Sequence, residues 1–170
     1  MPTLYAVDPP ILGVDFTATY SDAKYTEFKV GQIVSTNAGD YMFVKNNTGG
    51  ATTAYDVLII DHQGYLTAGV TQTNDDGAPL QVGIPQAAIT SAYFGWAFVG
   101  GSGDGTATCS VNVLANCAID VPLYTTATAG KLDDATASAK LVSGLKLTTA
   151  NGGSTAACPA MATGRLQILS

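Results

Sequence analysis

Glycine and proline interrupt this chain so often that helices of ordinary length have almost no room. From Gly31 onward, the stretches between these residues are short and rich in Val, Ile, Thr, Tyr and Phe, which favour strands. Residues typical of turns separate the stretches, for example Asn46–Gly50 and Asn151-Gly152-Gly153. The pattern predicts an all-β protein, folded as an antiparallel β-barrel or sandwich.

The same pattern predicts the positions of individual elements. The expected strands are Lys29–Ser35, Asp40–Lys45, Val57–Ile60, Leu80–Ala87, Gly95–Val99, Ala107–Leu114, Ile119–Tyr124, Gly144–Leu147 and Arg165–Leu169. Two short helices are also predicted, Ser21–Phe28 and Asp134–Leu141, because each begins with a residue that can cap a helix.

The two halves of the chain resemble each other in the order of their segments. The segments that begin at Asp56, Gly64, Leu80 and Gly95 match, in this order, those that begin at Asp120, Gly130, Leu141 and Gly164. One unit alone is too small to bury its apolar face, so two units are expected to pack together. The predicted organisation is an N-terminal arm or first strand (1–28) followed by one β-barrel or sandwich domain (29–170), with halves of about 29–100 and 106–170. A flexible Gly-rich link, Gly100–Gly105, joins the halves.

The N-terminal segment 1–28 differs from the rest of the chain. Its prolines oppose regular structure, and aromatic side chains recur among Thr and Asp residues. Phe16, Ala18 and Tyr20 alternate with threonines, which predicts a short strand. Two interpretations remain open: an arm that docks on a neighbouring subunit, or a first strand that covers the domain's own core. The candidate interface residues are Tyr5, Pro9, Phe16, Tyr20, Tyr25 and Phe28.

Charge is scarce, and this excludes several classes of function. Only 12% of the residues are charged, and seven basic against thirteen acidic residues give a net charge of -6. No basic patch is available for phosphates, so nucleic-acid binding is not expected. The apolar runs are far too short to cross a membrane, and the N-terminus lacks the pattern of a secretory signal. The surface is expected to be neutral and polar, or to be covered by other protein chains.

Cysteine and acidic residues do not combine into a metal site. Cys109, Cys117 and Cys158 are odd in number, CxxC spacing is absent, and the chain has one histidine. One disulfide to Cys158 or a metal site remains open, but three buried free thiols are favoured. The adjacent acids Asp75-Asp76 and Asp133-Asp134 lack the ligand spacing of an EF-hand. No metal and no cofactor is predicted.

The sequence offers no catalytic set either. His62 lies in a predicted exposed turn, and no GxSxG elbow is present to supply a partner serine. The glycine-rich link lacks the Lys and the following helix of a phosphate-binding loop. Trp96 has two interpretations, a core residue or a platform on which a sugar stacks. We therefore predict that the protein is not an enzyme.

Several segments together resemble a known family. They are Val30–Val34, Tyr41–Lys45, Val82–Gln86, Phe94–Gly101 and Val121–Leu132. In their order and content they resemble head decoration (cement) proteins of tailed bacteriophages, over about Val30 to Leu169. Phe94 stands where that family often has tyrosine, and the segment before Val30 has no such match.

The resemblance implies a non-enzymatic, all-β virion protein on the outer surface of a phage capsid, made in the host cytoplasm. Such a protein binds the major capsid protein, cements neighbouring subunits and stabilises the head against internal DNA pressure. It also implies self-association, with a homotrimer expected first and a dimer second. The alternative is a head-fibre-like module that binds a glycan or receptor in an aromatic groove around Trp96. A hydrolase that uses His62 or paired aspartates is a third hypothesis.

Overall fold

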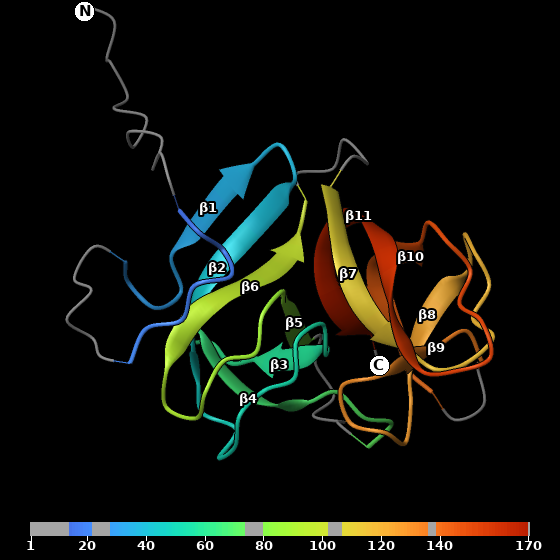
Figure 1. Ribbon diagram of the computed structural model, residues 1–170, viewed down its shortest axis with the longest axis horizontal. Coiled ribbons are helices and arrows are strands. Elements are labelled where there is room, and N and C mark those ends of the chain that lie inside the picture. The colour runs from blue at the N-terminus through green and yellow to red at the C-terminus, as the bar shows by residue number, and fades with distance from the viewer. Residues whose placement is uncertain (1–13, 22–27, 74–79, 102–106, 136–138, 170) are drawn as a thin grey trace, which may run out of the picture.

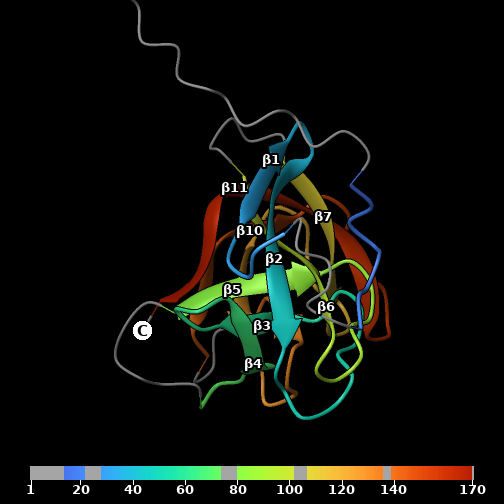
Figure 2. The ribbon, with the colours of Figure 1, turned by 90° about the vertical axis from the view of Figure 1, so that its left-hand side faces the viewer.

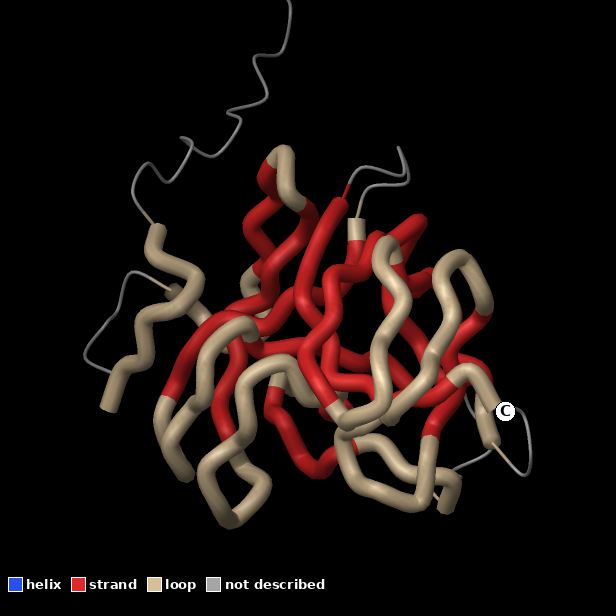
Figure 3. The backbone as a smooth tube through the Cα atoms, turned by 45° about the vertical axis from the view of Figure 1, so that its right-hand side comes forward, coloured by secondary structure: helices blue, strands red, loops and turns tan. Residues whose placement is uncertain are grey.

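The computed structural model describes residues 14–21, 28–73, 80–101, 107–135 and 139–169, and these residues form eleven strands and no helix. The all-β class is therefore confirmed (Figures 1 and 3). The strands are β1 (Ile33–Thr36), β2 (Gly39–Asn46), β3 (Leu58–Ile60), β4 (Tyr65–Gly69), β5 (Leu80–Pro85), β6 (Phe94–Gly100), β7 (Ala107–Val113), β8 (Pro122–Thr125), β9 (Leu132–Asp133), β10 (Leu141–Leu147) and β11 (Ala156–Leu169). Over the described ranges, no helix that could cross a membrane is found.

Strands β2 to β6 pair in a closed ring, which we call the first ring. Going round it, β2 pairs with β6, β6 with β5, β5 with β3 and β3 with β4, all antiparallel. The ring closes where β4 pairs with β2 in the parallel sense. Closure gives each of these strands two partner strands within the ring. This ring faces the viewer in Figure 2.

Strands β7 to β11 form a second ring by the same set of pairings. β7 pairs with β11, β11 with β10, β10 with β8 and β8 with β9, all antiparallel, and β9 returns parallel to β7. Each pairing of the first ring thus has its counterpart in the second. The repeat suggested by the sequence corresponds to these two rings, which lie on the left and right in Figure 1. The sheet is mixed rather than purely antiparallel because β4 and β9 pair in parallel.

One of the four sequence matches differs from the strand pairing. The match of Gly95 with Gly164 would place Phe98 in correspondence with Gln167. In the structure, Phe98 lies opposite both Tyr41 and Ile84, whereas Ala162 lies opposite Ala107 and Leu145. Phe98 of the first ring therefore corresponds to Ala162 of the second. The difference arises because β11 is 14 residues long and continues well beyond the part that matches β6.

The final part of β11 joins the two rings. Beyond its pairing with β7, this strand places Gln167 opposite Gln81 of β5 and Arg165 opposite Gly100 of β6. Gly100 has a φ of +119°, a conformation that other residues rarely adopt. The chain can thus bend at the end of β6 directly against β11.

Two hydrophobic clusters form the interior. The smaller one lies inside the first ring and consists of Met42, Val44, Leu58, Ile60, Leu66, Ile89, Ala97 and Val99. The larger one includes Val111, Leu123, Leu132 and Leu147 of the second ring, and it continues onto the outer face of the first ring through Trp96 and Phe98. Both faces of the β2–β6 ladder are therefore buried, and the larger cluster contains residues of both rings.

Several sequence-based expectations need correction. The described residues of the predicted helix Asp134–Leu141 are not helical, and Leu141 begins β10. The residues between Ser21 and Phe28 lie outside the described ranges. Strands β4 and β9 are absent from the expected strands, and β10 and β11 begin earlier than predicted.

Candidate functional site

All five phenylalanines and the one tryptophan of the chain gather on one face of the first ring, together with Tyr20 and Tyr41. On this face, Tyr41 of β2 lies opposite Phe98 of β6, and Phe43 lies opposite Trp96. The rings contact one another edge to face, with 5.6 Å between the centroids of Tyr41 and Phe98 and 5.1 Å between those of Phe43 and Trp96. We call this group of eight side chains the aromatic face.

Part of the N-terminal segment covers the aromatic face. Phe16 stacks on Tyr41, with ring centroids 4.1 Å apart. Tyr20 and Phe94 exchange two backbone hydrogen bonds of 2.9 Å, and the ring of Phe28 meets Trp96 edge to face at 5.0 Å. Among the candidate interface residues, Phe16, Tyr20 and Phe28 thus pack on the core of their own chain. Tyr5, Pro9 and Tyr25 lie outside the described residues.

The strand expected at Phe16–Tyr20 does not form. Residues 16 and 17 lie in a turn, and Tyr20 makes an isolated bridge to Phe94. The Asp15 carboxylate accepts hydrogen bonds from the Thr17 hydroxyl and from the Thr17 backbone N–H at 2.8 Å. These bonds hold the pKa of Asp15 below its ordinary value. Local side-chain bonding thus competes successfully with the strand pattern.

Trp96 is a core residue. It is 1% exposed, and the rings of Phe16, Phe28 and Phe43 surround it. Its indole Nε1 is buried and has no hydrogen-bond partner. The ring faces are therefore closed to a sugar, and the groove that a glycan-binding module requires is not present at this residue.

The three cysteines are free and buried, as favoured from the sequence. The Sγ of Cys117 lies 3.4 Å from Oδ1 of Asp133, and one ligand atom each from Cys117, Asp133 and Asp134 lie within 4.8 Å of one another. The fold already uses these groups, because Asp133 also accepts the backbone N–H of Asp134, and Asp134 accepts that of Ala118. Burial raises the pKa of Cys117 to about 12, so it is a neutral thiol at neutral pH. These contacts account for the cluster without a metal.

Burial of the thiols predicts that the free energy of unfolding decreases at alkaline pH. Burial raises the pKa of Cys109 and Cys117 to about 12, whereas in the unfolded chain both thiols ionise near pH 9.0. These thiols should leave the free energy of unfolding nearly unchanged between pH 7 and about pH 8. Above it, the unfolded state alone releases the protons, so stability falls by up to about 1.4 kcal/mol per pH unit for each thiol.

Urea denaturation between pH 7 and pH 10 measures this dependence. The variant Cys109→Ala should reduce the slope above pH 9, because one of the three thiols whose pKa is raised by burial is then absent. Stability that stays flat from pH 8 to pH 10 in the unmodified chain would contradict the prediction.

His62 lies beside a hollow of about 440 Å³ bounded by β3, β4 and β5. It is exposed, whereas the neighbouring Asp61 carboxylate accepts the backbone N–H groups of Gln63 and Tyr65 at 2.8 and 2.9 Å. Asp61 therefore shapes the turn and is occupied by backbone donors. No serine or cysteine lies among the described residues that line the hollow, so His62 has no such nucleophile to activate there.

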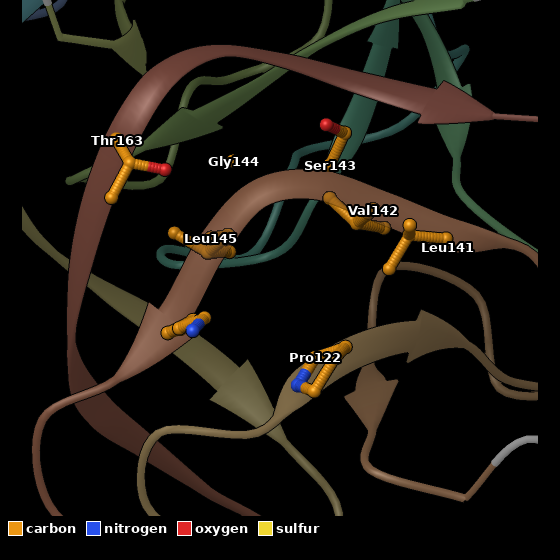
Figure 4. A pocket seen from close by; sticks show the side chains of 8 residues that line it. Pro122, Leu141, Val142, Ser143, Gly144, Leu145 and Thr163 are labelled. Atoms are coloured by element: carbon orange, nitrogen blue, oxygen red, sulfur yellow. The ribbon is translucent and has the colours of Figure 1, made fainter. Parts of the chain in front are cut away.

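A smaller hollow of about 160 Å³ opens where β10 bulges (Figure 4). Gly144 has a φ of +83°, and the register of β10 shifts there against both β8 and β11. Pro122, Leu145 and Thr163 line the opening. Lys146 is the one charged residue on its wall, so the described lining holds no acid–base pair.

An internal ion pair connects the two rings. Asp56, just before β3, pairs with Lys131, just before β9, and both side chains are largely buried. The same carboxylate oxygen accepts a 2.7 Å hydrogen bond from the Asn112 side chain of β7. Next to this pair, the Val57 N–H donates to the Gly130 carbonyl at 2.9 Å. These groups stabilise the junction and are not available for chemistry.

Comparisons of the chain with protein-family models, with curated proteins and with solved structures found no match. The function is therefore inferred from the residues and from their arrangement. Within the described ranges, that arrangement contains a tightly covered aromatic face, two closed rings and groups whose polar atoms serve the fold.

Proposed function

We propose that this protein is a capsid decoration (cement) protein. It binds the outer surface of a phage head and connects neighbouring subunits of the major capsid protein. The observation that carries the proposal is that β11 pairs with strands of both rings and that the surface of this body has very little charge. The family resemblance of Val30–Leu169 points in the same direction.

Rigidity suits a protein that resists expansion of a shell. The genome presses shell subunits apart, so a clamp has to keep its shape while its contacts are loaded. Here β11 pairs with strands of both rings, and the Asp56–Lys131 pair joins them at a second place. Strand pairing and an ion pair between the rings oppose their separation under load.

Sparse charge suits a large contact area. Seven basic and thirteen acidic residues share a surface of 8679 Å², which is one charge for about 430 Å². Contact with another protein therefore requires the desolvation of few ions, which is the costly part of burying a polar surface. Repetition over the shell adds avidity, so each contact can be weak.

Binding to purified heads tests the proposal. Heads that lack the protein are mixed with the purified chain and imaged by electron cryomicroscopy, and their DNA release on heating is measured. We expect ordered density on the outer surface and DNA release at a higher temperature. A variant that lacks residues 2–13 tests the arm, because Tyr5 and Pro9 are candidate contacts. Heads that acquire no density at saturating concentrations of the full chain would refute the proposal.

A further inference from the structure

Strand β1 has an open edge. Within the part of the chain that the structure describes, each of the other ten strands pairs with at least two strands, whereas β1 pairs with β2 alone. The β1–β2 hairpin stands out from the body in Figures 2 and 3. No described strand pairs with its other side, which can therefore accept a further strand.

The register shows which groups this edge presents. Thr36 lies opposite Gly39 at the turn, and the Phe43 N–H donates to the Gln32 carbonyl at 2.8 Å. Because backbone groups alternate along a strand, Gln32, Val34 and Thr36 face β2. Ile33 and Ser35 consequently direct their N–H and C=O groups away from it.

Apart from its short length of four residues, this edge lacks the features that usually prevent strands from pairing. The sequence of β1 is Ile-Val-Ser-Thr, without charge, proline or bulge. Ile33 is also one of three large apolar residues that are strongly exposed among those described, at 36%. The net charge of -6 makes two copies of the chain repel each other. Because β1 carries no charge, two copies can meet at this strand without bringing like charges together.

We propose that β1 pairs with β1 of a second copy, antiparallel across a two-fold axis at Val34. In this register, Ile33 faces Ser35 of the second copy, and the outward groups of both residues form about four hydrogen bonds between the chains. Val34 lies opposite its own copy in a non-hydrogen-bonded pair. The two first rings then share one continuous sheet.

The symmetry follows from the number of open edges. A trimer formed by strand addition needs two different edges on each subunit, whereas a two-fold pair uses the same edge twice. Among the described strands, β1 is the one that pairs with a single neighbour, so pairing through β1 favours the dimer over the homotrimer expected from the resemblance. Four residues on each side bury far less than the roughly 1,200 Å² of a stable interface, so the dimer is weak in solution. This inference does not depend on the proposed function.

Cysteine cross-linking tests the register. Val34→Cys places two thiols opposite each other at the axis, where the geometry permits a disulfide, and mild oxidation should yield a covalent dimer. The matched control is Ser35→Cys, whose thiol is more exposed but whose copies lie diagonally, too far apart for a disulfide. We expect about tenfold more dimer for Val34→Cys. Equal yields, or more dimer for Ser35→Cys, would overturn the proposal.

Sedimentation equilibrium on the otherwise unmodified chain provides a second test. Ser35→Pro removes an outward N–H without touching the bonds to β2, so the fold should persist while the dimer dissociation constant rises about tenfold or more. Ser35→Ala keeps the N–H and should leave this constant unchanged. A chain that remains monomeric at millimolar concentration overturns the proposal, as does an oligomer that is unaffected by Ser35→Pro. Because capsids are not needed, failure here is distinct from failure to bind heads.

Discussion

The variant Gly100→Ala should lose more than about 4 kcal/mol of its free energy of unfolding. Gly100 ends β6 with a φ of +119° and lies opposite Arg165 of β11. A Cβ atom there would overlap with the carbonyl oxygen of Gly164 and lie 3.1 Å from the Cα of Arg165. Because both obstacles belong to the backbone, β11 would have to separate from β6. The cost thus combines backbone strain with the loss of a junction between the rings.

Chemical denaturation followed by circular dichroism measures this loss. The matched control is Gly153→Ala, because a Cβ atom at Gly153 has no other atom within 4 Å and its φ is not positive. That variant should stay within about 0.5 kcal/mol of the unmodified chain. A Gly100→Ala variant as stable as the control would show that β11 does not hold the rings in this register.

The variant Trp96→Ala should lose about 4 kcal/mol of stability and melt about 10 °C lower. Trp96 is 1% exposed, and the rings of Phe16, Phe28 and Phe43 pack against it in edge-to-face geometry. Its removal leaves a cavity in the aromatic face and releases the N-terminal segment that covers it. Thermal melts of the two proteins provide the measurement.

Trp96→Phe is the matched control for this prediction. Because the indole Nε1 has no hydrogen-bond partner, replacement by the smaller phenylalanine removes side-chain volume but breaks no hydrogen bond. It should cost about half as much as alanine. If alanine were tolerated as well as phenylalanine, the packing described for Trp96 would be wrong. Loss of glycan binding in Trp96→Ala would be informative only in protein shown to be folded.

The sequence predicts the strands whose side-chain pattern matches their environment. Residues 40–45 and 95–99 are rich in apolar and aromatic residues, because β2 and β6 are buried on both faces. The repeat is also detectable, since Gly64 and Gly130 keep positive φ values at matching places before β4 and β9. Runs of apolar residues and glycines in turns are features of short segments, so they can be recognised in a sequence without knowledge of distant partners.

Other elements depend on partners that are distant in the sequence. Two-residue β9 is too short for any periodic pattern, and it exists because β7 and β8 lie on either side of it. The first half of β11 contains Pro159, which opposes a strand, yet Pro159 pairs opposite Ser110 of β7. The predicted helix at Asp134–Leu141 is wrong because Leu141 joins the ladder between β8 and β11.

The candidate residues show the same limit. Aromatic side chains at Phe16, Tyr20 and Phe28 mark the N-terminal segment as a place of contact. Composition cannot reveal that the contact partner is Trp96 and its neighbours within the same chain. The sequence also does not show that β1 has a single partner strand, because this depends on which strands pair with β2 in the fold.

The placement of β11 has a consequence for the order of events during synthesis. The first ring is complete once β6 has left the ribosome, because its five strands need nothing from later in the chain. The second ring cannot close until β11 has emerged. At that stage of synthesis the first ring has all its strands and the second ring does not. Tyr41 and Phe98 stay partly exposed until β7 packs against them. We therefore expect the second ring to close last during synthesis.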